Sequence, residues 1–341
     1  DQHLWKVKYD RRTWKVVSTN SMLGKLRSKA GWLYAVPYCK PAQFSRGASL
    51  PLHPWLLGAW LGDGSSAGTP KLHNPEKDLQ QRFCKYLPWG DRGRVVTPTN
   101  RCAEVAVTGG GVTRALRSLG LYGHRSWEKF IPEAYLLAPV EERWALLAGL
   151  LDTDGSIANQ NRTVEYTTTS HRLAADVTLL VQSLGGRASS VERTTTYDYE
   201  GEKKEGRLSY RIRITFPTGG VTPVTSKKHL DKWDASAGQR RYKYITGIEP
   251  IGEEETVCIK VDAKDSCYLT RDFIVTHNTP TALEKIAQDQ VPALVIVDNT
   301  SLFEQWMNAV QTFLDVPGGI GSIAAGVCDW EGRGLVIATY H

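Results

Sequence analysis

Two apolar runs of the chain end in the same way, and this internal repetition constrains the fold more than any other feature of the sequence. Pro54–Leu61 runs into Gly62-Asp63-Gly64, and Trp144–Leu151 runs into Asp152-Thr153-Asp154-Gly155. The runs lie about ninety residues apart, and each is followed by polar, β-prone sequence and then by a helical pattern. Such a repeat indicates one structural unit that is used twice.

The sequence outside this repeat has a different character. Apolar and polar residues alternate from His3 to about Val36, which predicts a β-hairpin, and Ser18–Leu26 is expected to form a short helix capped by Ser18 or Thr19. We expect further short strands at 245–248, 256–261, 268–270 and 273–276. From Thr279 the pattern becomes helix 281–287, strand 293–297, helix 302–313 and strand 335–338, which is typical of an α/β fold.

The region after the second motif has its own pattern. A strand is expected at 164–170, followed by a helix at 171–184 that Gly185-Gly186 ends. Strands 191–199 and 208–216 are expected to form a hairpin across the charged turn 200–206.

Charge divides the chain at the same place as the change of pattern. Residues 279–341 hold two basic and seven acidic residues, a net charge of −5, so residues 1–278 carry +11 of the total of +6. A basic body suits a polyanionic partner, although a solubilising surface has the same composition. No membrane-length apolar run and no secretory leader is visible, so we expect a cytoplasmic protein without membrane contact. The six cysteines form no close pairs, which argues against disulfides and zinc: Cys39, Cys84, Cys102, Cys258, Cys267 and Cys328.

The repeated motifs carry a family resemblance. LLGAWLGDG (Leu56–Gly64) and, more closely, LAGLLDTDG (Leu147–Gly155) resemble the paired LAGLIDADG motifs of DOD-type homing endonucleases. The resemblance implies a monomeric α+β pseudo-dimer that cleaves double-stranded DNA, with Asp63 and Asp154 near its pseudo-twofold axis. Two carboxylates this close repel unless a cation bridges them, and hard oxygen ligands favour Mg²⁺, so both are expected to be catalytic and metal-binding. Small residues are expected between the two motif helices: Gly58, Ala59, Ala148 and Gly149.

Basic residues complete this expected site. Glu128–Pro132 resembles the K-x-I-P block of intein endonucleases, which implies that Lys129 stabilises a developing charge or orients water. Lys228 is the counterpart we expect in the second half; the alternative for both is a solvated surface lysine. Arg211 and Arg213 should share a strand face. The expected DNA-binding residues, with Tyr197, Tyr199 and Tyr210 interleaved, are Arg187, Arg193, Arg207, Arg211 and Arg213.

The string FIVTHNT resembles the C-terminal splice junction of inteins, whose all-β splicing domain is of the Hint type. The Asn278 side chain can cyclise onto its own carbonyl and cut the chain, His277 can act as a general acid or base, and the Thr279 hydroxyl can accept the other flank as an ester. By position, Cys258 and His3 resemble the residues that assist these steps in inteins. Alone, His-Asn-Thr would also fit a loop with an Asn turn.

This resemblance has several consequences. Splicing would need no cofactor, its partners would be the flanking extein segments, and the host would be a bacterial or phage-infected cell. Because an intein begins with Cys or Ser and this chain begins with Asp1, ligation of the flanks is not expected. Residues 279–341 resemble the start of a superfamily-two (DEAD/DEAH-like) helicase core, interrupted at its Walker A loop so that Thr279 would be a Mg²⁺-binding hydroxyl. ATP would serve only the complete host helicase, and an unrelated α/β fragment is the alternative.

The sequence thus predicts an α+β multidomain protein. An all-β splicing domain is expected from 1–45 and 236–278, a LAGLIDADG endonuclease from 46–235 inserted into it, and a partial α/β helicase segment at 279–341. The expected function is protein splicing combined with cleavage of the DNA allele that lacks the insertion. The alternative is a splicing remnant whose endonuclease has decayed into a DNA-binding or structural insert.

Overall fold

Both apolar runs form helices, and the two helices pack closely against each other. The computed structural model places α2 at Pro54–Asp63 and α6 at Val140–Asp154. A Cβ atom on Gly58 would lie 2.2 Å from the Leu146 carbonyl oxygen, and one on Gly149 would lie 2.2 Å from the Trp55 carbonyl oxygen. Only glycine permits this backbone approach, so Gly58 and Gly149, two of the four expected small residues, lie at the helix interface.

The chain divides into two compact units. One comprises residues 36–244 and 269–275, and the other comprises residues 1–35, 245–268 and 276–341. The structure describes residues 3–44, 49–99, 102–158, 163–199, 201–217, 221–234, 242–252, 261, 263, 267–277, 286, 291–297 and 300–340.

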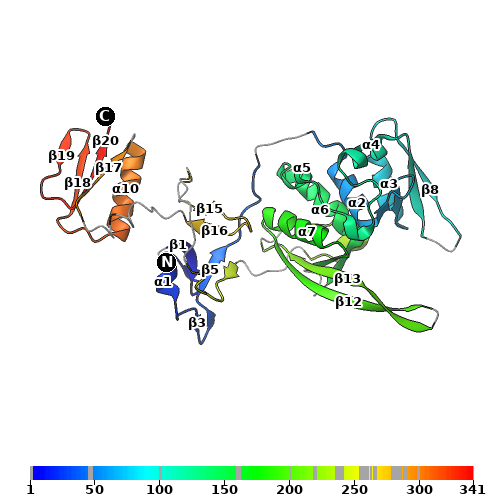
Figure 1. Ribbon diagram of the computed structural model, residues 1–341, viewed down its shortest axis with the longest axis horizontal. Coiled ribbons are helices and arrows are strands. Elements are labelled where there is room, and N and C mark those ends of the chain that lie inside the picture. The colour runs from blue at the N-terminus through cyan, green and yellow to red at the C-terminus, as the bar shows by residue number, and fades with distance from the viewer. Residues whose placement is uncertain are drawn as a thin grey trace. The chain divides into compact units, whose positions relative to one another are not determined.

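The larger unit contains the same fold twice (Figure 1). Each motif helix leads into a four-stranded antiparallel sheet, and the strand orders β6-β7-β9-β8 and β10-β11-β13-β12 are equivalent. One helix, α3 or α7, stands between the second and third strands of its half. The first half has β6 (Gly64–Ser65), β7 (Lys71–His73), α3 (Lys77–Lys85), β8 (Arg92–Val96) and β9 (Glu104–Thr108). The second half has β10 (Gly155–Ala158), β11 (Thr163–Thr168), α7 (His171–Ser183), β12 (Arg187–Tyr199) and β13 (Glu202–Thr215).

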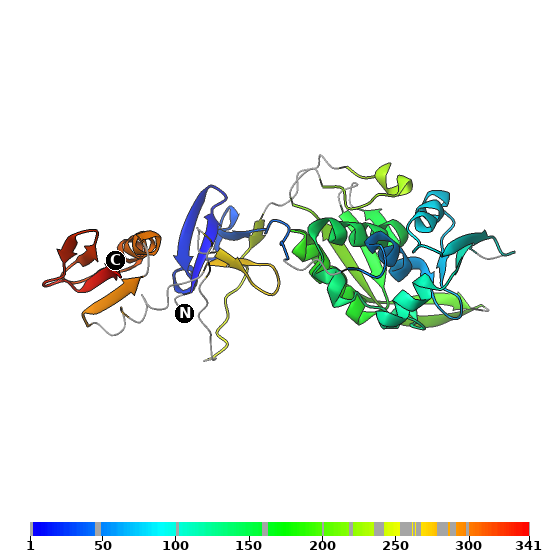
Figure 2. The same ribbon diagram turned by 90° about the horizontal axis from the view of Figure 1, so that it is seen from above.

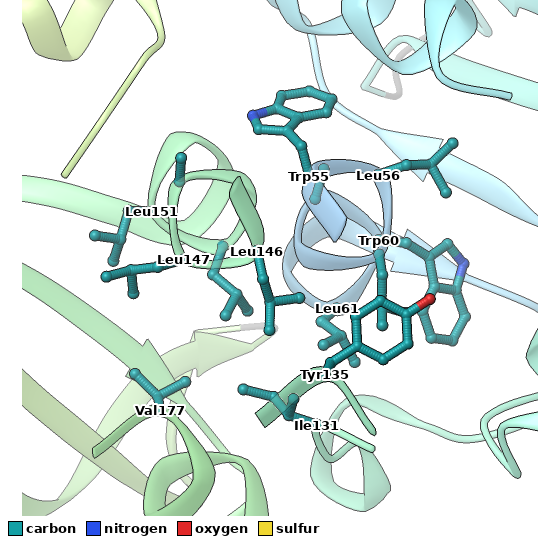
Figure 3. Packing of buried hydrophobic residues seen from close by; sticks show 14 of the residues in the cluster. Trp55, Leu56, Trp60, Leu61, Ile131, Tyr135, Leu146, Leu147, Leu151 and Val177 are labelled. Atoms are coloured by element: carbon teal, nitrogen blue, oxygen red, sulfur yellow. The ribbon is translucent and has the colours of Figure 1, made fainter. Parts of the chain in front are cut away.

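One hydrophobic core joins the two halves (Figure 3). Trp60 of α2 and Leu147 of α6 are fully buried in it, together with Val177 of α7. The Tyr135 hydroxyl donates to the Leu52 carbonyl oxygen at 2.8 Å, which pairs a polar group inside this core. The shorter helices around the core are α4 (Gly111–Ser118), η1 (Ser126–Glu128), α5 (Glu133–Leu136) and α8 (Lys227–Leu230).

The hairpin of β12 and β13 extends beyond the helices of its half (Figure 1). Its strands are longer than the sequence predicts, because residues 202–206 of the expected turn pair with β12 down to Tyr199–Glu202. The charged sequence therefore lies within a strand. A register shift between Thr194 and Thr196 interrupts the side-chain alternation.

The first residues of the smaller unit form the predicted hairpin. β1 (Leu4–Tyr9) pairs with β2 (Thr13–Ser18), and Ser18 caps α1 (Thr19–Met22) through its side chain. β1 also pairs with β5, through Lys8↔Ala35 and Tyr9↔Tyr34. The strand expected at 245–248 is wrong: β14 ends at Tyr244, and Ile245 only donates its amide to the Tyr34 carbonyl oxygen. The other strands of this unit are β3 (Arg27–Ser28) and β4 (Gly31–Trp32). Three strands include residues of both units, β5 (Tyr34–Pro37), β15 (Cys267–Leu269) and β16 (Val275–His277), and β14 (Tyr242–Tyr244) belongs to the larger unit.

The C-terminal residues form a small α/β sheet of order β17-β20-β18-β19. The β17–β20 and β18–β20 pairs are parallel. α10, the orange helix in Figure 2, lies against this sheet, and buried apolar residues make the contact. This agrees with the predicted change to an α/β pattern, although β18 and β19 were not predicted. The elements are β17 (Ala293–Val297), α10 (Thr300–Phe313), β18 (Ile320–Ala324), β19 (Val327–Asp329) and β20 (Leu335–Thr339).

Within the described part of the chain, none of the helices has both the length and the apolar character to span a membrane.

Candidate functional site

Asp63 and Asp154 are brought together at the ends of the two motif helices. Each is the last residue of its helix, and Gly64 and Gly155 are the equivalent C-caps. A Cβ atom on Gly62 would lie 3.3 Å from Asp154 Oδ2, so α2 approaches the second carboxylate directly. The two carboxyl groups share a hydrogen bond. The repeat in the sequence therefore produces one shared acidic site.

Electrostatics make the two carboxyl groups unequal. Burial, and then the negative charge of Asp63, raise the pKa of Asp154 to about 7, against the opposing charges of Lys129 and Lys228. Burial also raises the pKa of Asp63, but the Asn74 amide donates to Asp63 Oδ2 at 2.6 Å and opposes this rise. In the absence of a cation, the pair thus holds a proton near neutral pH.

Lys129 lies within the site, and hydrogen bonds hold its ammonium group in place. Its side chain is 2% exposed, and its ammonium donates to the carbonyl oxygens of Trp60, Leu61, Gly62 and Gly64, with distances from 2.7 to 3.3 Å. Burial lowers its pKa to about 8, while Asp154 and Asp63 oppose that change. This lysine holds the last turn of α2, whose carbonyls have no intrahelical partners. These contacts favour a positioning role for Lys129, and the expectation that it stabilises a developing charge or orients water stays a prediction.

Lys228 lies on α8 and is exposed, and its positive charge lowers the pKa of both carboxyl groups. The start of α8 is held by Asp152, a fully buried carboxylate of the second motif. Asp152 accepts the backbone amides of Thr225 at 2.7 Å and Ser226 at 2.8 Å, and the Trp55 indole N–H at 3.0 Å. The motif thus supplies one acid for the site and another that anchors the segment carrying Lys228.

Tyr166 of β11 lies beneath the carboxylates. It is completely buried, and its hydroxyl has no hydrogen-bond partner among the described residues. Burial, and then the charges of Asp154 and Asp63, raise its pKa well above the ordinary value. Tyr166 and Asn74 have no local sequence pattern that points to the site, whereas Asp152 is visible inside the second motif although no role was predicted for it.

Four of the five expected DNA-binding arginines share the outer face of the second sheet. Arg187 of β12 pairs with Thr215 of β13, and Arg193 pairs with Ser209. Paired residues point to the same face of a sheet, and Thr215 and Ser209 alternate along β13 with the same face as Arg211 and Arg213. Ile212 and Ile214 point to the opposite, buried face. Arg211 and Arg213 both pair with Glu165, at 3.6 and 2.8 Å.

The fifth arginine and the tyrosines are placed differently. Arg207 lies beside the register shift of the hairpin, and its guanidinium carbon is 3.7 Å from the Trp127 ring centroid. Because the register shift interrupts the alternation of side chains, that alternation does not assign Arg207 to the sheet face that carries the other four arginines. Tyr210 packs its ring against His171 on the helix side of the sheet, at 5.4 Å between centroids. The side chains of Tyr197 and Tyr199 lie outside the described residues.

The expected splicing residues are described only in part. A nitrogen of the His3 imidazole lies 2.5 Å from the Thr276 hydroxyl oxygen, so the start of the chain contacts the residue before His277. Burial lowers the pKa of His3. The backbone of His277 belongs to β16, but its side chain lies outside the described residues, as do Asn278, Thr279 and Cys258.

A divalent cation fits the donor set of the acidic site. In the described residues no cluster of three or more His, Cys, Asp or Glu side chains could hold a metal, so the protein would offer two carboxylates. Two hard oxygen donors with open positions suit Mg²⁺, which keeps water and phosphate ligands. Burial and the negative charge of Asp63 raise the pKa of Asp154, and a bound cation would relieve the same repulsion between the two carboxylates.

Comparisons with known proteins agree with the repeated fold. Residues 141–216, from the start of α6 to the end of β13, match the LAGLIDADG-like domain family. The chain is similar to "Replicative DNA helicase DnaB" of Mycobacterium intracellulare, with 31% identity over 235 residues, covering 68% of this chain and 36% of that protein. It is also similar to an iron–sulfur cluster assembly SufBD family protein of Mycobacterium leprae, with 28% identity over 256 residues, covering 66% of this chain and 28% of that protein.

The match to solved structures is weak. The homing endonuclease I-DmoI in complex with DNA and Ca aligns with a TM-score of 0.35 and 13% identity, covering 53% of this chain and 96% of that chain. A likeness at that level supports no conclusion. The chain spans only 16% to 36% of the length of the curated relatives that it matches. The comparisons and the geometry together show a protein with a LAGLIDADG-like domain and with sequence similarity to replicative helicases.

Proposed function

We propose that residues 46–235 form a LAGLIDADG homing endonuclease that cuts both strands of DNA, and that this endonuclease is inserted into an intein. The observation that carries the nuclease proposal is the meeting of Asp63 and Asp154 at the ends of two equivalent helices. The retention of both acids in one site favours an active enzyme over a decayed insert.

Each side chain of the site has a separate proposed role. Asp63 and Asp154 would bind Mg²⁺, which supplies Lewis acidity at the scissile phosphates. Asn74 fixes the orientation of the Asp63 carboxylate, and Lys129 fixes the helix end from which it projects. The exposed ammonium of Lys228, which acts electrostatically on both carboxylates, is suited to charge that develops on a phosphate.

The basic sheet face supplies a surface for the DNA backbone. Arg187, Arg193, Arg211 and Arg213 share this face, and it is turned away from the core. Contacts of this kind fix the register of a protein on DNA, and neutralising several phosphates makes binding strongly dependent on salt. Glu165 restrains Arg211 and Arg213, so their guanidinium groups are partly ordered before DNA arrives.

The nuclease proposal is tested with Asp63→Asn and Asp154→Asn. The substrate is plasmid DNA carrying the uninterrupted host gene, and the readouts are double-strand cleavage with Mg²⁺ and DNA affinity by gel shift. Each substitution should abolish cutting and preserve binding, because it removes a metal ligand and leaves the arginine face intact. The matched control is Glu133→Gln, an exposed acid on α5, which should cut like the parent chain. Cleavage that survives in both Asp variants would refute the assignment.

We also infer that residues 1–45 and 236–278 form a Hint-type splicing domain, separate from the α/β segment at 279–341. The contact between His3 and Thr276 supports this, because it joins the two ends of the expected intein. The names of the relatives support it as well, because a helicase and an iron–sulfur assembly protein have unrelated functions. Nevertheless, each of these two proteins aligns with about two thirds of this chain, and the aligned part is a minor part of that protein's length. That pattern fits a mobile element shared by different hosts. The similarity to replicative helicases supports a helicase host, whereas the superfamily-two assignment and the Walker A insertion point rest on the tail sequence alone.

The splicing proposal is tested by intact-mass measurement of the purified chain during incubation. Cyclisation of Asn278 should release residues 279–341, a 63-residue fragment beginning at Thr279. Asn278→Ala should suppress this fragment, and His3→Ala should leave it, since His3 is expected to assist the first acyl shift instead. The same fragment forming at the same rate from Asn278→Ala would show that the cleavage has another cause.

A further inference from the structure

The end of each motif helix is held by a side chain that approaches from outside the helix. In the first half this is Lys129, whose shortest hydrogen bond, 2.7 Å, goes to the carbonyl oxygen of Gly64. Gly64 is the C-cap of α2 and the first residue of β6. Lys129 follows the last strand of its half, β9, with α4 and η1 between them.

The equivalent position in the second half is occupied by a histidine. Gly155 is the C-cap of α6 and the first residue of β10, so it corresponds to Gly64. Burial lowers the pKa of the His229 imidazole, and a hydrogen bond to the Gly155 backbone is among the interactions that oppose this change. The Nδ1 atom of His229 lies 2.8 Å from the Ser226 hydroxyl oxygen. His229 is 4% exposed and lies on α8, which follows β13, the last strand of its half.

The segment that carries His229 is anchored to the helix whose end it holds. Asp152 of α6 accepts the amides of Thr225 and Ser226, which immediately precede α8. Leu61 stands at the corresponding place in the first motif and is buried among apolar residues. Each half therefore holds its helix end by a different set of contacts, while the backbone of the C-cap glycine is contacted in both.

We propose that His229 is the second-half counterpart of Lys129, a positioning residue that holds the end of α6 and thereby the Asp154 carboxylate. The lysine of the first half both fixes a helix end and places a positive charge beside the carboxylates. In the second half these tasks are divided: His229 fixes the helix end, and the neighbouring Lys228 supplies the charge. The expected pairing of Lys129 with Lys228 is therefore replaced by a pairing with His229.

The structural arm of the test is amide hydrogen exchange, which does not depend on cleavage. The amides of Gly64 and Gly155 donate to the carbonyls of Trp60 and Leu151, so they report the last turn of each helix. His229→Leu should raise exchange at 151–156 by about tenfold, the loss of one hydrogen bond, and should leave 60–65 unchanged. Lys129→Met should raise exchange at 60–65 and leave 151–156 unchanged. His229→Lys should restore protection, and His171→Leu, on the exposed start of α7, is the control that changes neither segment.

The functional arm rests on the proposed nuclease activity and follows each DNA strand with its own label. His229→Leu should accumulate nicked DNA in which one strand is cut, and Lys129→Met should accumulate the opposite nick, with DNA affinity unchanged in both. Parent-level protection of 151–156 in His229→Leu would overturn the proposal, as would the same strand being nicked by both variants. If the parent chain cuts no DNA, the proposed nuclease function fails, and the exchange result still decides the role of His229.

Discussion

Replacing Gly58 by alanine tests whether the two motif helices need their backbone contact. The new Cβ atom would lie 2.2 Å from the Leu146 carbonyl oxygen and 2.9 Å from the Leu150 amide nitrogen. Ordinary contact begins near 3.4 Å, so α2 and α6 must separate by about 1 Å, and a gap of that size forfeits a quarter to a half of each dispersion contact across it. Both neighbours are backbone atoms, which cannot rotate away.

The expected magnitude follows from two opposing effects. Overpacking in a core costs about 1–3 kcal/mol, and backbone neighbours place Gly58→Ala at the upper end. Removing a glycine from a helix interior returns about 1 kcal/mol. We therefore expect a net loss of about 2 kcal/mol in the free energy of unfolding of the larger unit.

Urea denaturation followed by tryptophan fluorescence measures this loss, because Trp55 and Trp60 lie on α2. Gly247→Ala is the control: its new Cβ would meet nothing within 4 Å, and stability should change by less than about 0.5 kcal/mol. A Gly58→Ala chain as stable as the parent, or more stable, would refute the argument that close backbone packing sets the spacing of Asp63 and Asp154.

Three further predictions concern the buried polar groups. The pKa of Asp154 is about 7 in the folded chain and about 3.9 in an unfolded one, so between these two pH values the folded state binds more protons than the unfolded state. The Tm of the metal-free protein should therefore fall as the pH rises through this range. Asp154→Asn should flatten this dependence of Tm on pH, and an unchanged dependence would contradict the assignment. Asp152→Asn should lower the free energy of unfolding by about 3 kcal/mol in urea titrations, because the new amide faces the buried donors of Trp55 and Thr225. Tyr166→Phe should leave that free energy unchanged or raise it by up to about 1 kcal/mol, since the lost hydroxyl has no partner among the described residues, and a clear loss would show that a partner exists.

Much of the architecture was readable from local patterns. The apolar runs, the hairpin at the start of the chain, the helix at 171–184 and the α/β pattern of the tail all follow from periodicity and from caps such as Ser170 and Gly185, and all are present. The errors lie where pairing decides the outcome. Residues 202–206 are too charged to suggest a strand, yet a partner strand orders them, and 245–248 has strand character but is not a strand. Strand pairing depends on contacts distant in sequence, which local propensity does not contain.

The sequence by itself determined that there are two similar halves and that Asp63 and Asp154 are equivalent, because a repeated motif places the same residue at the same helix position. It also indicated that small residues, among them Gly58 and Gly149, lie between the two motif helices. The tertiary structure decided what each polar group does. Lys129 holds the end of α2 because the carbonyl oxygens there surround its ammonium group. His229 has the equivalent position in the second half because the fold brings it to Gly155. Such roles depend on burial and on partners tens of residues away, so they exist only once the chain has folded.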